Sequence, residues 1–247
     1  MKAPGDLRFR ESPVFFLDSA KGFKRKKEGL LMSAAASPPP PPMSTKLRFR
    51  VFVDFWNFQL TLNERVGDSR FKIDWRSLAT RLVQESASLV NVTDYSYEGM
   101  IVFTSYNGKT EEGRKYRNWA TSWLDIQPGI QVRCYERRPK NHPKCPACHR
   151  PVEKCPDASC AADMSGTVEK GVDTAIATNM IRLAWENAYD VAILASSDAD
   201  LVPAVEFLDL RGFRVIQAGF PPSGAHLSRA CWGTIDVAKI RRTFERA

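Results

Sequence analysis

The chain has 247 residues, of which 43% are hydrophobic, and it carries a formal net charge of +8. This length allows one α/β domain with extensions and excludes two ordinary domains of independent function. Residues 1–43 hold eight Lys and Arg against four Asp and Glu, a surplus of +4, which leaves +4 for residues 44–247. The globular part is therefore mildly basic, which is compatible with a polyanionic partner but does not by itself indicate one.

Residues 1–43 show no apolar periodicity from which a core could be built. They contain the basic run 24–27 and the consecutive prolines 38–42, a composition typical of disordered segments. We expect a disordered extension, or alternatively a true translation start at Met43. No stretch approaches the roughly 20 apolar residues that span a bilayer. We expect a cytoplasmic protein without a membrane partner, because acidic residues in the extension argue against an organelle transit peptide.

From residue 48 onward, strand-like and helix-like segments alternate. The first half predicts strands over 50–54, 100–105 and 131–136, with helices over 74–84 and 111–124. The second half predicts a helix over 173–187, a buried strand over 191–195, a helix over 201–210, a strand over 214–218 and a last helix over 235–246. This succession indicates an α/β fold with a parallel sheet. We assign the domain to residues 44–225 and a C-terminal helix to 226–247.

Aspartates stand where predicted strands or loops give way to the next element. Asp54 ends the first strand, Asp173 opens a helix, and Asp198 and Asp200 follow the strand over 191–195. In open α/β sheets, ligands bind at the carboxyl ends of the strands, so these side chains are predicted to form one carboxylate cluster that holds a metal ion. Each aspartate taken alone is more simply interpreted as a structural helix N-cap, and it is the three sites together that favour the metal-binding interpretation.

The insertion over residues 138–165 has its own chemistry. Its cysteines follow a C-x-x-C and a C-x4-C spacing among prolines that enforce turns, and thiolates on tight turns suit a tetrahedral zinc ion. Two disulfides are the alternative, disfavoured because the chain lacks a secretion signal. The predicted zinc ligands are Cys145, Cys148, Cys155 and Cys160.

Other residues near this insertion have less specific roles. His142 and His149 can replace one thiolate, act as solvated loop residues or contact a phosphate backbone. Cys134 and Cys231 lie in apolar sequence surroundings, where buried free thiols are expected.

The segments VFVDFWN and KGVDTAIATNM, followed by ILASSDADLVP, resemble the NYN domain, the LabA-like branch of the PIN-like ribonucleases. The resemblance covers about residues 48–220 and implies a three-layer α/β/α sandwich. Two features depart from the family pattern. Ser197 and Ala199 stand where SGDGDF has glycines, and the cysteine-rich insertion is not part of the minimal domain.

The resemblance implies a metal-dependent ribonuclease that hydrolyses RNA phosphodiester bonds with Mg²⁺ or Mn²⁺, ions that prefer carboxylate oxygens. Asp54, Asp173, Asp198 and Asp200 then serve as catalytic residues and metal ligands. In the same reading, Asn57 orients a carboxylate or the substrate, Ser196 donates a hydrogen bond to a phosphate oxygen, and Lys170 meets the RNA backbone.

Several residues around the predicted site are of types that can bind RNA. Phe55, Trp56 and Phe58 offer either a face for stacking the bases of single-stranded or structured RNA or ordinary core packing. Two groups of cations can flank the site or be only solvated surface: Arg114, Lys115 and Arg117, and Arg133, Arg137, Arg138 and Lys140.

Two other classes of function remain as alternatives. The first is an RNA-binding module on the same fold, which binds RNA without cleaving it. A phosphatase of the haloacid dehalogenase type requires a second aspartate where this chain has Trp56. Whether the chain forms a homodimer is also left open.

Overall fold

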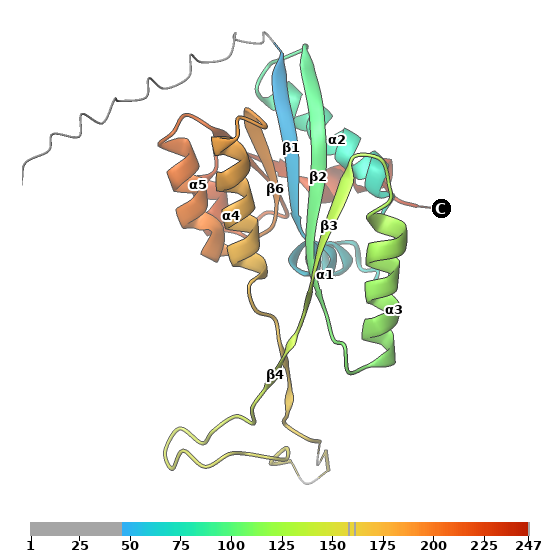
Figure 1. Cartoon of the computed structure of the whole chain (residues 1–247), viewed down its shortest axis with the longest axis vertical. Helices are drawn as coiled ribbons and strands as arrows, with labels where there is room; N and C mark the ends of the chain where they lie inside the picture. The colour runs from blue at the N-terminus through green and yellow to red at the C-terminus, as the bar shows by residue number, and fades with distance from the viewer. Residues whose placement is uncertain (1–45, 158, 161, 247) are drawn as a thin grey trace, which may run out of the picture. The chain divides into compact units, whose positions relative to one another are not determined.

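A six-stranded parallel sheet forms the centre of the protein in the computed structural model, which describes residues 46–157, 159–160 and 162–246. The extension predicted over residues 1–43 lies outside the described residues. In the sheet (Figure 1) the order is β3 (Ile130–Glu136), β2 (Tyr95–Tyr106), β1 (Leu47–Asp54), β6 (Val191–Ala195), β7 (Arg214–Gly219) and β8 (Gly233–Asp236).

Helices cover both faces of this sheet, because side chains of successive strand residues point to opposite sides. Val51 and Val53 of β1 pack with one group of helices, whereas Phe52 packs with the other. The first group is α1 (Phe55–Val66), α2 (Trp75–Leu89), α3 (Glu111–Trp119), the π-turn η1 (Ala120–Leu124) and α7 (Val237–Ile240). The second group is α4 (Val172–Trp185), the short η2 (Ala199–Leu201), α5 (Val202–Asp209) and α6 (Ala225–Ala230).

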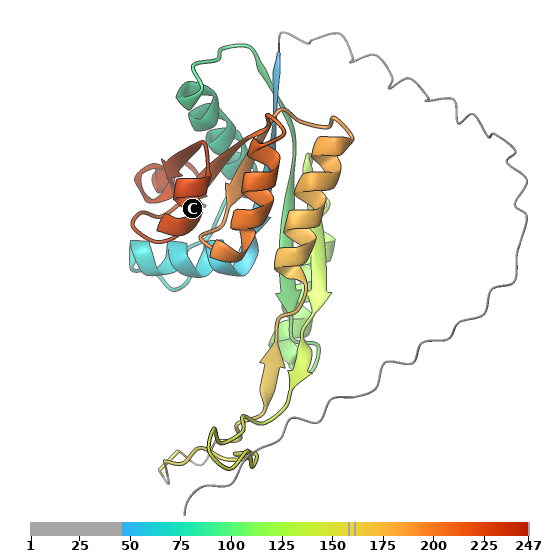
Figure 2. The ribbon, with the colours of Figure 1, turned by 90° about the vertical axis from the view of Figure 1, so that its left-hand side faces the viewer.

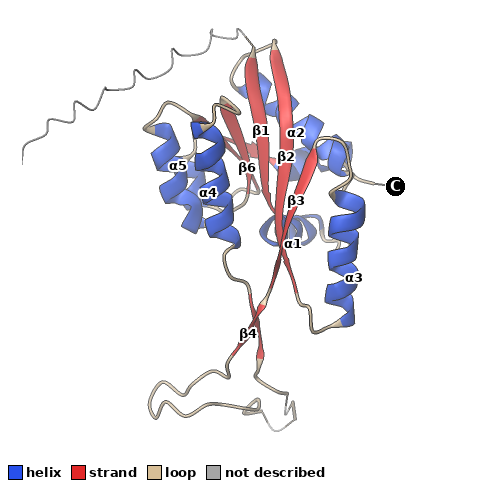
Figure 3. Cartoon of the chain, viewed as in Figure 1, coloured by secondary structure: helices blue, strands red, loops and turns tan. Residues whose placement is uncertain are grey.

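The fold is therefore the predicted three-layer α/β/α sandwich. Figure 3 shows the strands between the two helical layers, and Figure 2 shows α4 and α5 together on one side of the sheet. All five residues of β6 are buried, as expected for a parallel strand covered on both faces. No helix in the described part of the chain is long and apolar enough to cross a membrane.

All five predicted strands are present, each with bounds close to those expected. The prediction of a helix over 235–246 is wrong. Ile235 pairs with Ala218 of β7 and is buried, so residues 233–236 form the edge strand β8, and Asp236 caps only the short α7. The final turn, η3 (Arg241–Thr243), precedes Phe244, whose side chain is buried in the core. Residues 226–246 are therefore integral to the sandwich rather than an appended helix.

Helix α1 is missing from the sequence prediction. Its buried residues Phe55, Phe58 and Leu62 have helical spacing, and Gly67 ends the helix in a left-handed conformation with φ 70°, which glycine adopts without strain. The aromatic residues directly after the strand masked this periodicity. Because Asp54 is the N-cap of α1, the helix that the prediction missed helps to hold a site residue.

A long arm leaves the sheet at the end of β3. Its root is an antiparallel ribbon of β4 (Arg138–Lys140) and β5 (Gly166–Val168), and Figures 1 and 2 show it projecting away from the sandwich. Beyond the ribbon, isolated bridges join Lys144 to Pro151 and Lys154 to Asp163. Residues 138–168 are called the cysteine arm below.

Candidate metal centre

Three of the predicted aspartates meet at the carboxyl edge of the sheet. Asp54 ends β1, and β1 lies beside β6, with Val53 opposite Ala195, so the loop that follows β6 starts next to Asp54. Asp173 enters from the first turn of α4. One carboxylate oxygen from each of Asp54, Asp173 and Asp198 lies within 4.8 Å of the other two.

The position of Asp173 depends on how α4 begins. Gly171 precedes the helix in a left-handed conformation with φ 87°, a conformation that favours glycine over other residues. This turn brings the chain from the cysteine arm into the helix and places Asp173 two residues later. A carboxylate in the first helical turn also lies near the positive end of the helix dipole.

Asp54 is almost fully enclosed, with 4% of its surface exposed. Its Oδ1 accepts the backbone N–H of Asn57 at 3.4 Å, and its Oδ2 accepts the hydroxyl of Ser196 at 3.2 Å. Burial, followed by the nearby charges of Asp173 and Glu169, raises the pKa of Asp54 to about 7 despite these hydrogen bonds. A buried carboxyl group that holds its proton near neutrality is a frequent mark of a functional site.

The loop that carries Asp198 is held on three sides. Asn57 Oδ1 accepts the backbone N–H of Ser197 at 2.8 Å, and Ser196 Oγ accepts the backbone N–H of Asp198 at 3.1 Å. Gln217 of β7 donates to the carbonyl oxygen of Ser196 at 3.0 Å. The loop that carries the Asp198 carboxylate is thus fixed by α1 through Asn57 and by β7 through Gln217.

The other predicted site residues lie in different environments. Asp200 is exposed and outside the group of three, although its charge contributes to the raised pKa of Asp173, which burial dominates. Ser196 is only 2% exposed, so the prediction that it contacts a phosphate oxygen is wrong, because its hydroxyl serves Asp54 inside the fold. Lys170 is exposed.

Glu169 is a site residue that the sequence analysis missed. It lines the same groove as the aspartates, and one of its oxygens accepts the hydroxyl of the buried Ser105 at the end of β2. Arg137, one residue before the cysteine arm, donates to the same hydroxyl at 3.1 Å and lies 3.9 Å from Glu169. The available signal was its position four residues before Asp173.

The groove above the carboxylates has one apolar wall. Trp56 and Leu60 lie one turn apart on α1, and Leu60 is 58% exposed. The indole N–H of Trp56 donates to the carbonyl oxygen of Ser105 at 2.7 Å, which fixes the ring beside the cluster. Phe55 and Phe58 are buried core residues, so of the three aromatic residues considered for stacking, Trp56 alone faces the groove.

The three aspartates fit a divalent cation. Oxygens that bind one Mg²⁺ at 2.0–2.1 Å lie about 3 to 4 Å apart, so the observed spacing needs little contraction. None of the three aspartates forms an ion pair with Lys or Arg among the residues that the structure describes. Their negative charge is thus left for a cation to balance.

Comparison with protein families agrees with this architecture. The model of the NYN domain matches residues 48–238, most of the chain. The chain belongs to the NYN domain family. A solved structure of a protein of unknown function from Vibrio parahaemolyticus is 16% identical to it, over 83% of this chain and 99% of that chain, with a TM-score of 0.49. No curated protein matches the chain.

This NYN domain accommodates the serine that replaces the first glycine of the expected SGDGDF pattern. A Cβ added at Gly224 would come within 2.9 Å of both the Cα and the Cβ of Ser197, and Gly224 itself has a φ of 73°. Glycine at position 224 therefore makes room for Ser197. Both carboxylates of the SSDADL loop remain, and Asp198 stays in the cluster.

The cysteine arm of the NYN domain carries four free thiols in two hairpins. The backbone N–H groups of Cys148 and Ala147 donate to the Cys145 thiol and lower its pKa, and His149 follows in a left-handed conformation with φ 57°. In the second hairpin, Cys160 donates its backbone N–H to the carbonyl oxygen of Asp157 at 3.0 Å. No three of the arm's thiols lie within 4.8 Å of one another in the described arm.

Two further thiols belong to the sandwich. Cys134 in β3 and Cys231 after α6 are free and partly buried, close to the expectation for them. Burial raises the pKa of Cys134 to about 11 and that of Cys231 to about 12, so both remain protonated thiols near neutral pH.

Proposed function

We propose that this NYN domain is a metal-dependent ribonuclease that hydrolyses RNA phosphodiester bonds. The observation that carries the proposal is the convergence of Asp54, Asp173 and Asp198 at the carboxyl edge of the sheet. NYN domains belong to the PIN-like nuclease superfamily, and clustered carboxylates without cationic partners suit Mg²⁺ or Mn²⁺.

The residues of the site have different roles in this proposal. Asp54, Asp173 and Asp198 hold the cation, and Asp200 extends the negative surface at the rim. A divalent ion held there supplies positive charge against the phosphate and lowers the pKa of a nearby water. Asn57 and Ser196 act behind the carboxylates by fixing their loops. We assign the exposed Lys170 a contact with the RNA backbone.

Trp56 and Leu60 support RNA as the substrate. Aromatic and apolar side chains beside a phosphodiester site can stack an unpaired base. The groove offers this wall on α1 directly beside the carboxylates, so a single strand can place its phosphate over the cluster and one base against Trp56.

We also propose that Cys145, Cys148, Cys155 and Cys160 bind a structural zinc ion. The N–H groups aimed at the Cys145 thiol stabilise its thiolate form, which is the form that binds zinc. Binding by all four requires the thiols to draw together, because no three of them lie within 4.8 Å of one another in the described arm. We place the protein in the cytoplasm, where reduced thiols favour zinc over disulfides.

The test of the nuclease proposal is cleavage of end-labelled single-stranded RNA by the full chain with Mn²⁺, with Mg²⁺ and with EDTA. Asp198→Asn should abolish cleavage, whereas Asp209→Asn, at an exposed position at the end of α5, should cleave like the wild type. Cleavage that persists in EDTA or in Asp198→Asn rejects the proposal.

The alternative is an RNA-binding module on the same fold. It predicts that the wild type and Asp198→Asn are equally inert with either metal while both still bind RNA. The cluster of three carboxylates disfavours this alternative, because a module that binds polyanions gains nothing from a concentrated negative charge.

A further inference from the structure

The cysteine arm begins and ends beside the metal centre. Its first strand, β4, continues directly from the carboxyl end of β3, and β5 ends at Val168, next to the groove residue Glu169. Figures 1 and 2 show the arm projecting from this edge of the sheet. A ligand that lies along the arm is therefore led to the carboxylates.

The arm carries acidic and basic side chains that differ in the contacts they form. Asp157 accepts hydrogen bonds from the backbone and hydroxyl of Ser159, and Asp163 accepts from the backbone of Ser165 and pairs with His142 at 3.2 Å. The Lys and Arg side chains form no ion pair in the described part of the arm, and neither does Glu153, the third acidic residue there. The basic side chains are exposed and number five: Arg138, Lys140, Lys144, Arg150 and Lys154.

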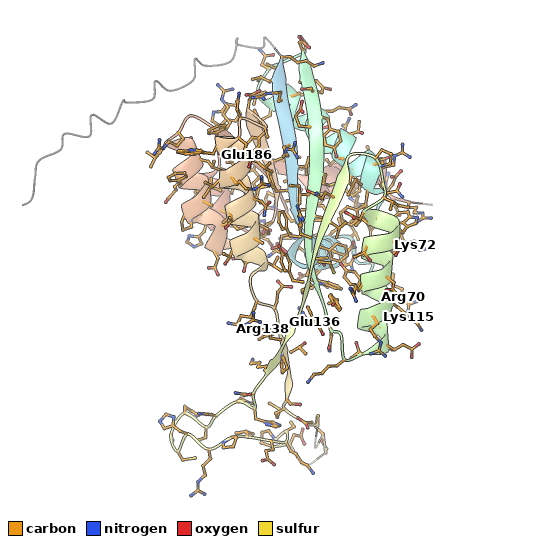
Figure 4. The ribbon with its side chains drawn as sticks, in the orientation of Figure 1. Arg70, Lys72, Lys115, Glu136, Arg138 and Glu186 are labelled. Carbon is orange, nitrogen blue, oxygen red and sulfur yellow. The ribbon has the colours of Figure 1, made fainter. Side chains whose placement is uncertain are left out.

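Three of these cations lie in β4 or in the segment that follows it toward the first hairpin. Arg138 and Lys140 are two residues apart in β4 and so share one face of the ribbon, where their cross-strand neighbours are Val168 and Gly166 rather than carboxylates. Figure 4 shows Arg138 at the root of the arm. Lys144 follows after a further four residues, so the row spans at most about 25 Å.

We propose that this row of cations, Arg138, Lys140 and Lys144, binds the phosphate backbone of an RNA strand outside the scissile bond. The inference rests on the proposed nuclease function, because that function explains why a polyanion should lie at the root of the arm. Phosphate contacts position a strand without reading its sequence. The arm therefore makes the domain prefer long single strands over short oligonucleotides, whatever their sequence.

The experiment compares two triple variants of the full chain that remove the same charge. The arm variant is Arg138→Gln, Lys140→Gln and Lys144→Gln. The control variant is Arg70→Gln, Lys72→Gln and Arg76→Gln, in and beside the segment between α1 and α2, where the side chains are exposed and form no ion pair in the described chain. Arg70 and Lys72 are labelled in Figure 4.

Binding of a fluorescein-labelled single-stranded RNA of about 20 nucleotides is measured by anisotropy at several salt concentrations. All variants carry Asp198→Asn and no Mg²⁺ or Mn²⁺ is added, so that no cleavage occurs and zinc in the arm is kept. Loss of three phosphate contacts should lower the slope of log affinity against log salt by about 2. The affinity of the arm variant should fall by 10-fold or more, and that of the control by less than 3-fold. Equal weakening of both variants, or an unchanged slope in the arm variant, overturns the inference.

Cleavage of a four-nucleotide RNA with Mn²⁺ separates this inference from the nuclease proposal. The arm variant should cut this short substrate nearly as fast as the wild type, because the short RNA can contact no more than the root of the row. A loss of cleavage in the arm variant shows that the cations serve the centre itself, which contradicts a role in backbone binding. If the wild type cuts no RNA while the arm variant alone loses affinity, the nuclease proposal fails and the backbone contact stands.

Discussion

Asn57 Oδ1 accepts the backbone N–H of Ser197 at 2.8 Å, which ties the first turn of α1 to the loop that carries Asp198. The backbone N–H of the same asparagine donates to Asp54. One neutral residue therefore holds two carboxylates of the cluster in register. Asn57 thereby keeps the carboxylates of Asp54 and Asp198 close together although they repel one another.

Asn57→Ala should weaken Mn²⁺ binding about 10-fold or more. The variant leaves the partly buried N–H of Ser197 without its partner, a loss of about 1–3 kcal/mol, and frees the loop of Asp198. Titration calorimetry with Mn²⁺ measures the effect. Thr61→Ala is the matched control, because Thr61 lines the same groove but bonds only within α1. Equal Mn²⁺ affinity in both variants would reject this role for Asn57.

Asp54 should make the cation-free domain less stable as the pH rises. Its pKa is 3.8 in an ordinary environment and about 7 in the fold, so between these values the folded chain keeps a proton that the unfolded chain releases. This group's contribution is therefore complete below pH 3.8 and is lost as the pH rises through about 7.

Asp54→Asn removes this loss, which is at most about 4 kcal/mol. In EDTA the variant should resist urea better than the wild type at pH 8, and the difference should shrink at pH 5. Asp209→Asn should change stability little at either pH, because its side chain is exposed. A variant that is less stable than the wild type at pH 8 would contradict the assignment.

The affinity for Mn²⁺ should rise with pH and level off above about 7, because Asp54 must lose its proton to bind a cation. Glu169→Gln removes a neighbouring negative charge that raises the pKa of Asp54, so the rise should move to lower pH. Glu136→Gln, at the exposed end of β3, should leave the midpoint in place. The measurement is Mn²⁺ affinity between pH 5.5 and about 8.5, and an unmoved midpoint in Glu169→Gln counts against its place at the centre.

Cys148→Ser should lower the zinc content of the purified protein while leaving the thermal unfolding of the sandwich nearly unchanged, since the arm's bridges lie within the arm. Cys134→Ser is the control, because Cys134 lies in β3 outside the arm and its partly buried thiol stays protonated. Atomic absorption measures the zinc. Wild-type protein without zinc would reject the proposed zinc site.

The sequence alone predicted five of the six strands of the central sheet and the meeting of Asp54, Asp173 and Asp198, because these depend on local patterns. Asp200, predicted in the same cluster, lies outside it. Apolar runs such as residues 191–195 identify a strand without knowledge of its neighbours, and parallel strands must end at one edge of the sheet. The KGVD and SSDADL motifs supplied the resemblance, and the family match over 48–238 confirmed it.

Tertiary packing decided what the local patterns left open. Residues 233–236 form a strand only because β7 offers an unpaired edge, and Ser196 turns inward only because β6 lies beside β1. Glu169 reaches the groove through contacts with Ser105 and Arg137, which are 64 and 32 residues away in the chain. Local sequence determines which residues can form an element or bind a cation, but long-range contacts decide which of them are buried, which repel one another and which face the groove.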